Sequence, residues 1–436
     1  MNKSITICFI CQGSSNKDSK SKYEYMASIL AITTRYYNPN TKIVVGIPTP
    51  FEIYPEPGKD TYELLRNLNI EYTYTENYVS HDYKIANKLG LLDKLNNETD
   101  TDYILFLDTD IICTGELIPT EQMYNSDISG VFTDYCDRPN NDNGKYWKDL
   151  HDKLNISYNI PENPIGYSQF SHSPMWAHYL CAGYIFMKKN PIVSKTLNDM
   201  CSILYNEIGG HFKKSSNWGG HAAPDQQAIA LTVNKLNLTC CILDHEYVYS
   251  LIPGHYLPTD DPKFSSDYDD TIINKPTHMT PSYRLKIKTD DKICCKYCFD
   301  THLSTQQFIH YHKPSRIPEF FFGFGIKELL QNLKDNDWND NFELNDDNIH
   351  LFVAKSNEFC TNVVKRQNNQ LVFPIKVYKL ILNVINKTIK NDWVQSTHNV
   401  GKKKEKKQRC HVCNMYPSDH KSRNCPQKNY CRPCLT

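Results

Sequence analysis

Apolar and polar positions follow two kinds of pattern along the first part of the chain. Four short runs are apolar or alternate in polarity and predict strands, at 4–10, 41–48, 70–76 and 103–107. Between them, apolar residues recur every three or four positions and predict helices, at 23–37, 61–69 and 82–95. Strands that alternate with helices favour an α/β fold, in which ligands bind beyond the carboxyl ends of the strands.

The later part of the chain has fewer regular elements. Apolar runs predict strands at 179–189 and 308–314, and two helices are predicted to begin at Pro191 and Pro224. Segments that lack periodicity predict loops and short pieces over the site at 119–178 and a polar insertion at 255–300. We expect three parts: an α/β domain, a helical extension and a basic linker with a Cys-rich tail, at 1–325, 326–400 and 401–436.

Two carboxylates follow the apolar run YILFL, with one residue between them. They are Asp108 and Asp110. If strand geometry continues through them, positions i and i+2 share a face, and both carboxylates point the same way. Two adjacent like charges repel and call for a cation, and Mn²⁺ or Mg²⁺ is held by one or two carboxylates together with substrate phosphates. The pair therefore predicts a site for a divalent metal and a diphosphate.

Four segments in the same order resemble glycosyltransferase family eight, the glycogenin-like and lipopolysaccharide-galactosyltransferase-like enzymes. They lie within residues 4–320 and read NKLGLLDKL before YILFLDTD, YLCAGYIFMKK, PDQQ and FIHYHKP. The resemblance implies a GT-A fold, a Rossmann-like mixed sheet flanked by helices. It also implies a metal-dependent hexosyltransferase that moves a sugar from a nucleotide-diphosphate sugar, a UDP-sugar, to an unidentified glycan or protein acceptor, with retention of configuration.

Residue roles follow from that resemblance. It implies that the metal is bound by Asp108, Asp110 and His310, and that the donor is bound by Lys88, Gly183, Lys313 and Asp108. Asp225 and Gln226 would lie near the anomeric carbon. The family's Asn is replaced by Cys181, and the shortened sequence after His310 leaves His312 as an alternative metal ligand.

Other interpretations remain open at this stage. Asp225 has a simpler role as a helix cap, and Lys88 as a solvated surface lysine. Paired aspartates with a metal also occur in nucleotidyltransferases, although an obvious Gly-rich phosphate loop is lacking near the first strand. A third alternative is a non-enzymatic, zinc-tailed adaptor with a decayed transferase body.

Composition limits the partners. The 49 basic and 49 acidic residues balance, so the chain is not uniformly nucleic-acid-binding, and only the basic tail offers a site for nucleic acid. No apolar run reaches the length of a signal sequence or a membrane span. We therefore expect no membrane contact and a cytoplasmic location, which would be the host cytoplasm or the virion if the Asn-, Ile- and Lys-rich usage reflects a large virus.

The cysteines concentrate near the end of the chain. Of the 17 cysteines, two closely spaced pairs predict a four-cysteine Zn²⁺ site, Cys410, Cys413, Cys431 and Cys434. His420 and Cys425 offer an alternative set with the first pair. A tail this short needs a metal to become ordered. The adjacent run KKKEKKQR is more typical of a solubilising spacer than of a nucleic-acid contact.

Overall fold

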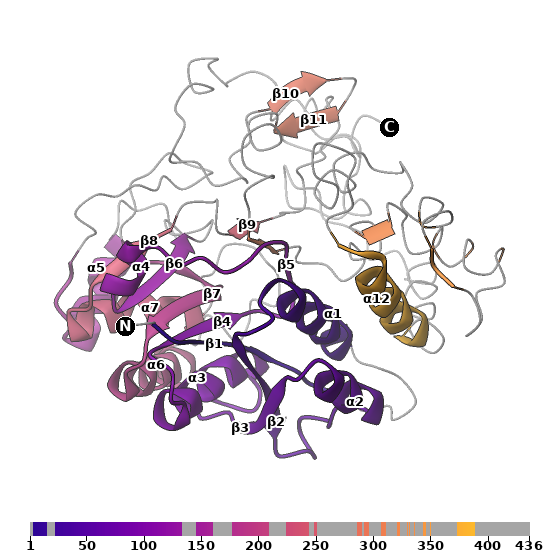
Figure 1. The fold of residues 1–436 in the computed structure, drawn as a ribbon. Helices are drawn as coiled ribbons and strands as arrows, with labels where there is room; N and C mark the ends of the chain where they lie inside the picture. Colours follow the sequence, from indigo (N-terminus) through magenta and orange to yellow (C-terminus); the bar gives the residue numbers. More distant parts are fainter. Residues whose placement is uncertain are drawn as a thin grey trace, which may run out of the picture. The chain divides into compact units, whose positions relative to one another are not determined.

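Seven strands form the central sheet, and they are β1 (Ile5–Ile10), β2 (Lys42–Thr49), β3 (Glu71–Glu76), β4 (Tyr103–Leu107), β6 (Ile128–Phe132), β7 (Leu180–Lys188) and β8 (Cys240–Ile242). Their order across the sheet is β3-β2-β1-β4-β7-β6-β8 (Figure 1). Strands β3, β2, β1 and β4 run parallel, whereas β7 is antiparallel to both β4 and β6. The predicted mixed α/β sheet is therefore confirmed.

The computed structural model describes the chain in several stretches, which are 3–14, 22–132, 145–159, 177–208, 224–243, 248–250, 286–289, 292–295, 307–310, 373–388 and isolated positions between 321 and 349. The chain divides into two compact units, Met1–Ile385 and Asn386–Thr436. The sheet and the site belong to the first unit. Within the described stretches, no helix combines the length and hydropathy needed to cross a membrane.

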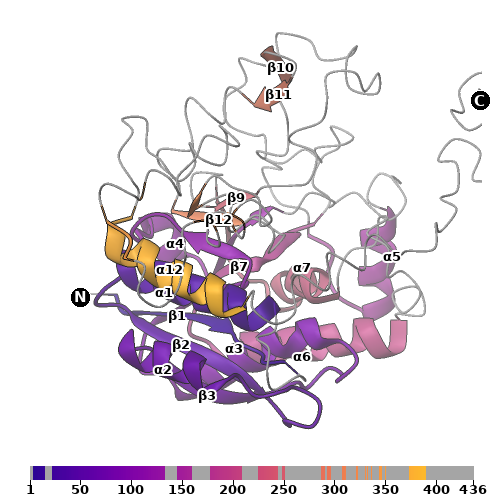
Figure 2. The same ribbon diagram turned by 90° about the vertical axis from the view of Figure 1, so that its right-hand side faces the viewer.

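Helices cover both faces of the sheet. They are α1 (Lys22–Tyr37), α2 (Lys59–Asn67), α3 (Asn87–Glu98), α4 (Glu121–Asn125), α5 (Lys145–Leu154), α6 (Pro191–Ile203), α7 (Pro224–Leu236) and α12 (Ile375–Thr388). One core cluster joins the sheet to α1 and α2, and a second joins it to α3, α5, α6 and α7 (Figure 2). A 3₁₀ turn, Lys84–Ala86, precedes α3, and a π-helical turn, Leu204–Ile208, follows α6.

Alternation along β4 links these two cores. Ile104 and Phe106 lie in the cluster of α3, α6 and α7, whereas Leu105 and Leu107 lie in the cluster of α1. All four side chains are buried. Burial on both faces explains why the whole run is apolar. Asp108 follows Phe106 by two positions, and residues two apart along a strand point to the same face of a sheet. The Asp108 carboxylate therefore lies on the face that α3, α6 and α7 cover.

Residues 119–178, which are predicted to form loops and short pieces, contain regular elements of the fold. This segment contributes α4, β6 and α5, and β6 is an inner strand of the sheet. Ser129 and Gly130 interrupt the apolar pattern of β6, and Gly130 is tightly packed, because a Cβ there would lie 3.1 Å from the Tyr184 carbonyl oxygen. The tight packing thus favours a small residue at the position where the apolar run is interrupted.

Two smaller sheets lie outside the central one. Strand β12 (Phe308–His310) pairs antiparallel with β5 (Ile111–Cys113) and parallel with β9 (Val248–Ser250). A hairpin, β10 (Lys286–Thr289) and β11 (Lys292–Cys295), lies within the predicted insertion. Within the predicted helical extension, 326–400, the structure describes helix α12.

Candidate functional site

The two aspartates lie in a tight turn rather than in a strand. Strand β4 ends at Leu107, and the Ile111 backbone N–H donates to the Asp108 carbonyl oxygen at 3.2 Å. The Asp108 N–H in turn donates to the Gly183 carbonyl oxygen at 2.8 Å, which ties the turn to β7. The expectation that strand alternation places both carboxylates on one face is therefore wrong. The turn after β4, and not the alternation of side chains along a strand, brings the two carboxylates to the same side.

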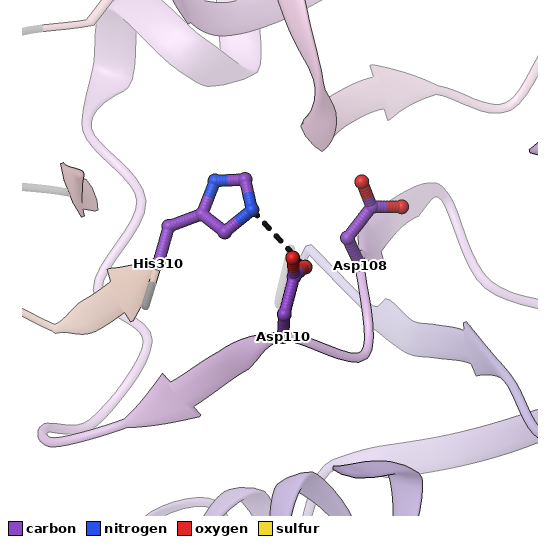
Figure 3. A group of neighbouring side chains, drawn as sticks. All are labelled: Asp108, Asp110 and His310. Atoms are coloured by element: carbon purple, nitrogen blue, oxygen red, sulfur yellow. Dashed lines mark hydrogen bonds and ion pairs between the residues drawn. The ribbon is translucent and has the colours of Figure 1, made fainter. Parts of the chain in front are cut away.

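Strand pairing delivers the histidine to this turn. In the register of β12 against β5, His310 lies opposite Ile111, the residue after Asp110. The His310 Nε2 and Asp110 Oδ1 atoms are 3.0 Å apart. Ligand atoms of Asp108, Asp110 and His310 all lie within 4.8 Å of one another (Figure 3). Residues that are 200 positions apart in sequence thus converge, as the sequence predicts.

The cluster suits a divalent cation. Two carboxylates and one imidazole form a mixed oxygen and nitrogen donor set. This set suits Mn²⁺ better than Mg²⁺, because Mg²⁺ prefers ligands that are all oxygen. A Cβ at Gly183 would lie 3.0 Å from Asp108 Oδ2 and 3.1 Å from His310 Cε1, so this position keeps the space beside the ligands open. The three residues therefore fit a bound metal.

Electrostatics at the cluster also favour added positive charge. Burial raises the pKa of Asp108, Lys88 opposes that shift, and the neighbouring Asp110 charge raises it further. Burial lowers the pKa of His310, but the Asp110 charge and hydrogen bond outweigh burial and hold that pKa well above its usual value. A hydrogen bond with Cys181, the residue in place of the family's Asn, acts in the same direction.

Lys88 lies at the centre of the site and is not a surface lysine. Only 5% of the residue is exposed. Its Nζ atom lies 3.0 Å from Asp108 Oδ1, 3.1 Å from Asp225 Oδ2 and 3.2 Å from the Ala182 carbonyl oxygen. These two carboxylates outweigh the effect of burial and raise the pKa of Lys88. The ammonium therefore joins a metal-ligand candidate to the predicted catalytic aspartate.

Asp225 and Gln226 lie in the first turn of α7. Asp225 is buried, and its carboxylate is engaged by side chains from other elements, so the helix-cap interpretation does not describe it. Gln226 is half-buried beside it. The next residue, Gln227, is buried and donates through Nε2 to the Tyr146 hydroxyl at 2.7 Å. Lys88, which contacts both Asp108 and Asp225, thus links Asp225 to the metal-ligand cluster.

One residue of this network was not predicted from the sequence. The Tyr83 hydroxyl donates to Asp225 Oδ1 at 2.6 Å across 142 positions of sequence. Tyr83 precedes α3 in a segment that resembles an ordinary helix start, so no local pattern marks it. Two predicted residues, His312 and Lys313, lie outside the described residues, as do all six candidate zinc ligands of the tail.

Comparison with known proteins gives a family profile and several solved structures. The Rhodobacterales glycosyltransferase domain matches residues 17–237. The galactosyltransferase LgtC with donor and acceptor sugar analogues has 12% identity and a TM-score of 0.37, covering 71% of this chain and 88% of LgtC. An active-site glutamine-to-glutamate variant of LgtC has 14% identity and a TM-score of 0.37, covering 76% and 95%. The bifunctional glycosyltransferase WbbM has 13% identity and a TM-score of 0.36, covering 72% and 46%. No curated protein sequence matches the chain.

Proposed function

Because the chain belongs to the Rhodobacterales glycosyltransferase domain family, we propose that it transfers a hexose from a UDP-sugar to a glycan or protein acceptor in a metal-dependent reaction. The observation that carries this proposal is the convergence of Asp108, Asp110 and His310 within 4.8 Å at the end of a buried strand. The family match favours glycosyl transfer over the nucleotidyl transfer that paired aspartates also serve.

The metal ligands are Asp108, Asp110 and His310, with His312 as the alternative imidazole. A bound Mn²⁺ or Mg²⁺ would supply positive charge to the diphosphate that leaves the sugar. Lys313 is proposed to add a donor toward the same phosphates. Gly183, where a Cβ would crowd Asp108 and His310, is proposed to keep room for the donor sugar beside these ligands.

Lys88 has a different role in this proposal from the direct phosphate contact that family resemblance implies. Its ammonium has three N–H donors, and two carboxylates and a carbonyl oxygen lie within hydrogen-bonding distance of them. Lys88 therefore holds Asp108 and Asp225 at a fixed separation. Asp225 lies in the first turn of α7, and the positive end of that helix's dipole favours an anionic or hydroxyl-rich substrate there.

Asp225 and Gln226 are proposed to contact the sugar. With Lys88 on one oxygen and Tyr83 on the other, Asp225 still has lone pairs that accept hydrogen bonds from sugar hydroxyls. Gln226 lies beside it and is assigned to the anomeric carbon. We propose retention of configuration, in which the acceptor attacks from the face that the diphosphate leaves and a departing phosphate oxygen takes the proton.

The remaining parts of the chain carry narrower proposals. The Cys-rich end is proposed to bind Zn²⁺ through Cys410, Cys413, Cys431 and Cys434, with His420 and Cys425 as the alternative ligands. Metal analysis of the purified chain before and after removal of residues 401–436 tests this proposal. A loss of about one Zn²⁺ per chain is expected on removal, the stoichiometry of one four-ligand site.

Metal-ligand variants test the proposed function. We expect Asp108→Asn and Asp110→Asn each to lower Mn²⁺-dependent UDP-sugar hydrolysis by roughly 100-fold or more, because each removes a charged ligand at the point where the diphosphate charge develops. A panel of UDP-sugars with and without Mn²⁺ should raise the melting temperature of the wild-type chain only, since ligands that bind the folded state stabilise it.

Asp100→Asn is the matched control, because Asp100 is an exposed carboxylate on the loop before β4 whose partner is Lys42. Its activity should equal that of the wild type. Unchanged hydrolysis in both site variants, or no UDP-sugar binding by the wild-type chain, contradicts the proposed function.

A further inference from the structure

A tyrosine from outside the predicted site holds the carboxylate of Asp225. The Tyr83 hydroxyl donates to Asp225 Oδ1 at 2.6 Å, while Lys88 Nζ lies 3.1 Å from Asp225 Oδ2. Only 2% of Asp225 is exposed. Each oxygen of this buried carboxylate therefore has a side-chain donor, and both donors come from the stretch of chain that enters α3.

Tyr83 is itself held at its backbone and at its ring. Its carbonyl oxygen accepts from Asn77 Nδ2 at 3.0 Å, and the same amide group donates to Asn87 Oδ1 at 3.0 Å, where α3 begins. Its ring stacks on Tyr205, with centroids 4.9 Å apart and planes at 22°. Tyr205 lies in the π-helical turn after α6, and Asn206 of that turn donates to the Val79 carbonyl oxygen at 3.1 Å.

This support restricts where the Tyr83 hydroxyl can point. The ring lies between the π-helical turn and the segment that enters α3, so the side chain can change rotamer only by losing the Tyr205 stack. Burial raises the pKa of Tyr83 well above its usual value, and the Asp225 charge raises it further, so the hydroxyl keeps its proton and remains a donor. A hydrogen bond to a charged group is among the stronger ones in proteins.

We propose that Tyr83 is a positioning residue that orients Asp225 toward the hydroxyl groups of the donor sugar and thereby sets which sugar is accepted. This inference rests on the proposed function, in which Asp225 contacts the sugar. Two oxygens that are each fixed by one donor present their remaining lone pairs in defined directions. An epimer that moves one hydroxyl then loses its hydrogen bond, and a site built to pair a hydroxyl rejects ligands that cannot pair.

Tyr83→Phe removes only the hydroxyl and keeps the ring that stacks on Tyr205. The expected result is a fall of roughly 10- to 100-fold in kcat/KM for the UDP-sugar that the wild-type chain hydrolyses best, the range for loss of a hydrogen bond to a charged group. The ratio of kcat/KM between UDP-glucose and UDP-galactose should move toward one. The affinity for UDP with Mn²⁺, measured by calorimetry, should stay within about twofold, because UDP has no sugar for Asp225 to contact.

Tyr146→Phe is the matched control, because it removes a hydroxyl that accepts from α7 at Gln227, two residues from Asp225. Its sugar preference should equal that of the wild type. Tyr205→Ala is the second variant, which leaves the Tyr83 hydroxyl but removes its stacking surface, and it should change the ratio in the same direction. An unchanged ratio in Tyr83→Phe, or a loss of UDP affinity equal to the loss in kcat/KM, overturns the inference. A wild-type chain that hydrolyses no UDP-sugar refutes the proposed function and this inference with it.

Discussion

Gly183 shows how a single missing side chain supports the metal cluster. A Cβ at this position would lie 3.0 Å from Asp108 Oδ2 and 3.1 Å from His310 Cε1, closer than ordinary van der Waals contact. We therefore expect Gly183→Ala to weaken Mn²⁺ binding about 10-fold by moving two ligands apart, an effect comparable to that of changing residues that orient metal ligands. Calorimetric titration with Mn²⁺ measures it. Gly58→Ala, where the nearest atom would be Glu24 Oε1 at 3.3 Å, is the control, and equal affinities in the two variants contradict the argument.

At the scale of elements, a buried histidine between helices α5 and α7 makes the free energy of unfolding depend on pH. His151 of α5 is buried; its Nδ1 lies 2.6 Å from the Trp147 carbonyl oxygen and its Nε2 lies 2.8 Å from Asn234 Nδ2 of α7. Burial lowers the pKa of His151 below its ordinary value of 6.5. As pH falls below 6.5, the unfolded chain therefore takes up this proton first, and the free energy of unfolding decreases. Urea denaturation between pH 8 and pH 5 should show a smaller decrease for His151→Gln, and identical pH dependence would contradict this assignment.

Elements in which apolar positions recur with a clear period were predictable from the sequence, whereas the contacts between elements were not. The strand Tyr103–Leu107 is apolar because both of its faces are covered, and that pattern is visible in sequence. Strand β6 is also an inner strand, but Ser129 and Gly130 interrupt its apolar run, so its sequence lacks a clear strand pattern. At the site, Asp108, Asp110, His310 and Asp225 follow from motifs. Tyr83 reaches Asp225 only through tertiary packing, for which the local sequence carries no signal.

At the scale of the whole molecule, the helical extension packs against the α/β core. Phe373, at the start of α12, is 1% exposed, and its ring centroid lies 5.8 Å from that of Tyr36 and 5.4 Å from that of Tyr37, both at the end of α1. The compact unit that contains the sheet accordingly continues to Ile385. The predicted division between residues 325 and 326 stays a prediction that stability measurements can decide.

Removal of the Phe373 ring is the direct test of that division. If α12 and the sheet unfold together, Phe373→Ala should lower the free energy of unfolding by about 3–5 kcal/mol, the usual cost of truncating a buried aromatic residue. It should also keep a single transition by both circular dichroism and UDP–Mn²⁺ binding, because the lost contacts lie between the extension and α1. Leu380→Ala, at an exposed position of the same helix, is the control and should change stability little. A separate low-temperature transition that leaves UDP binding intact would show instead that the extension folds independently of the sheet, since coincident transitions are the mark of one cooperative unit.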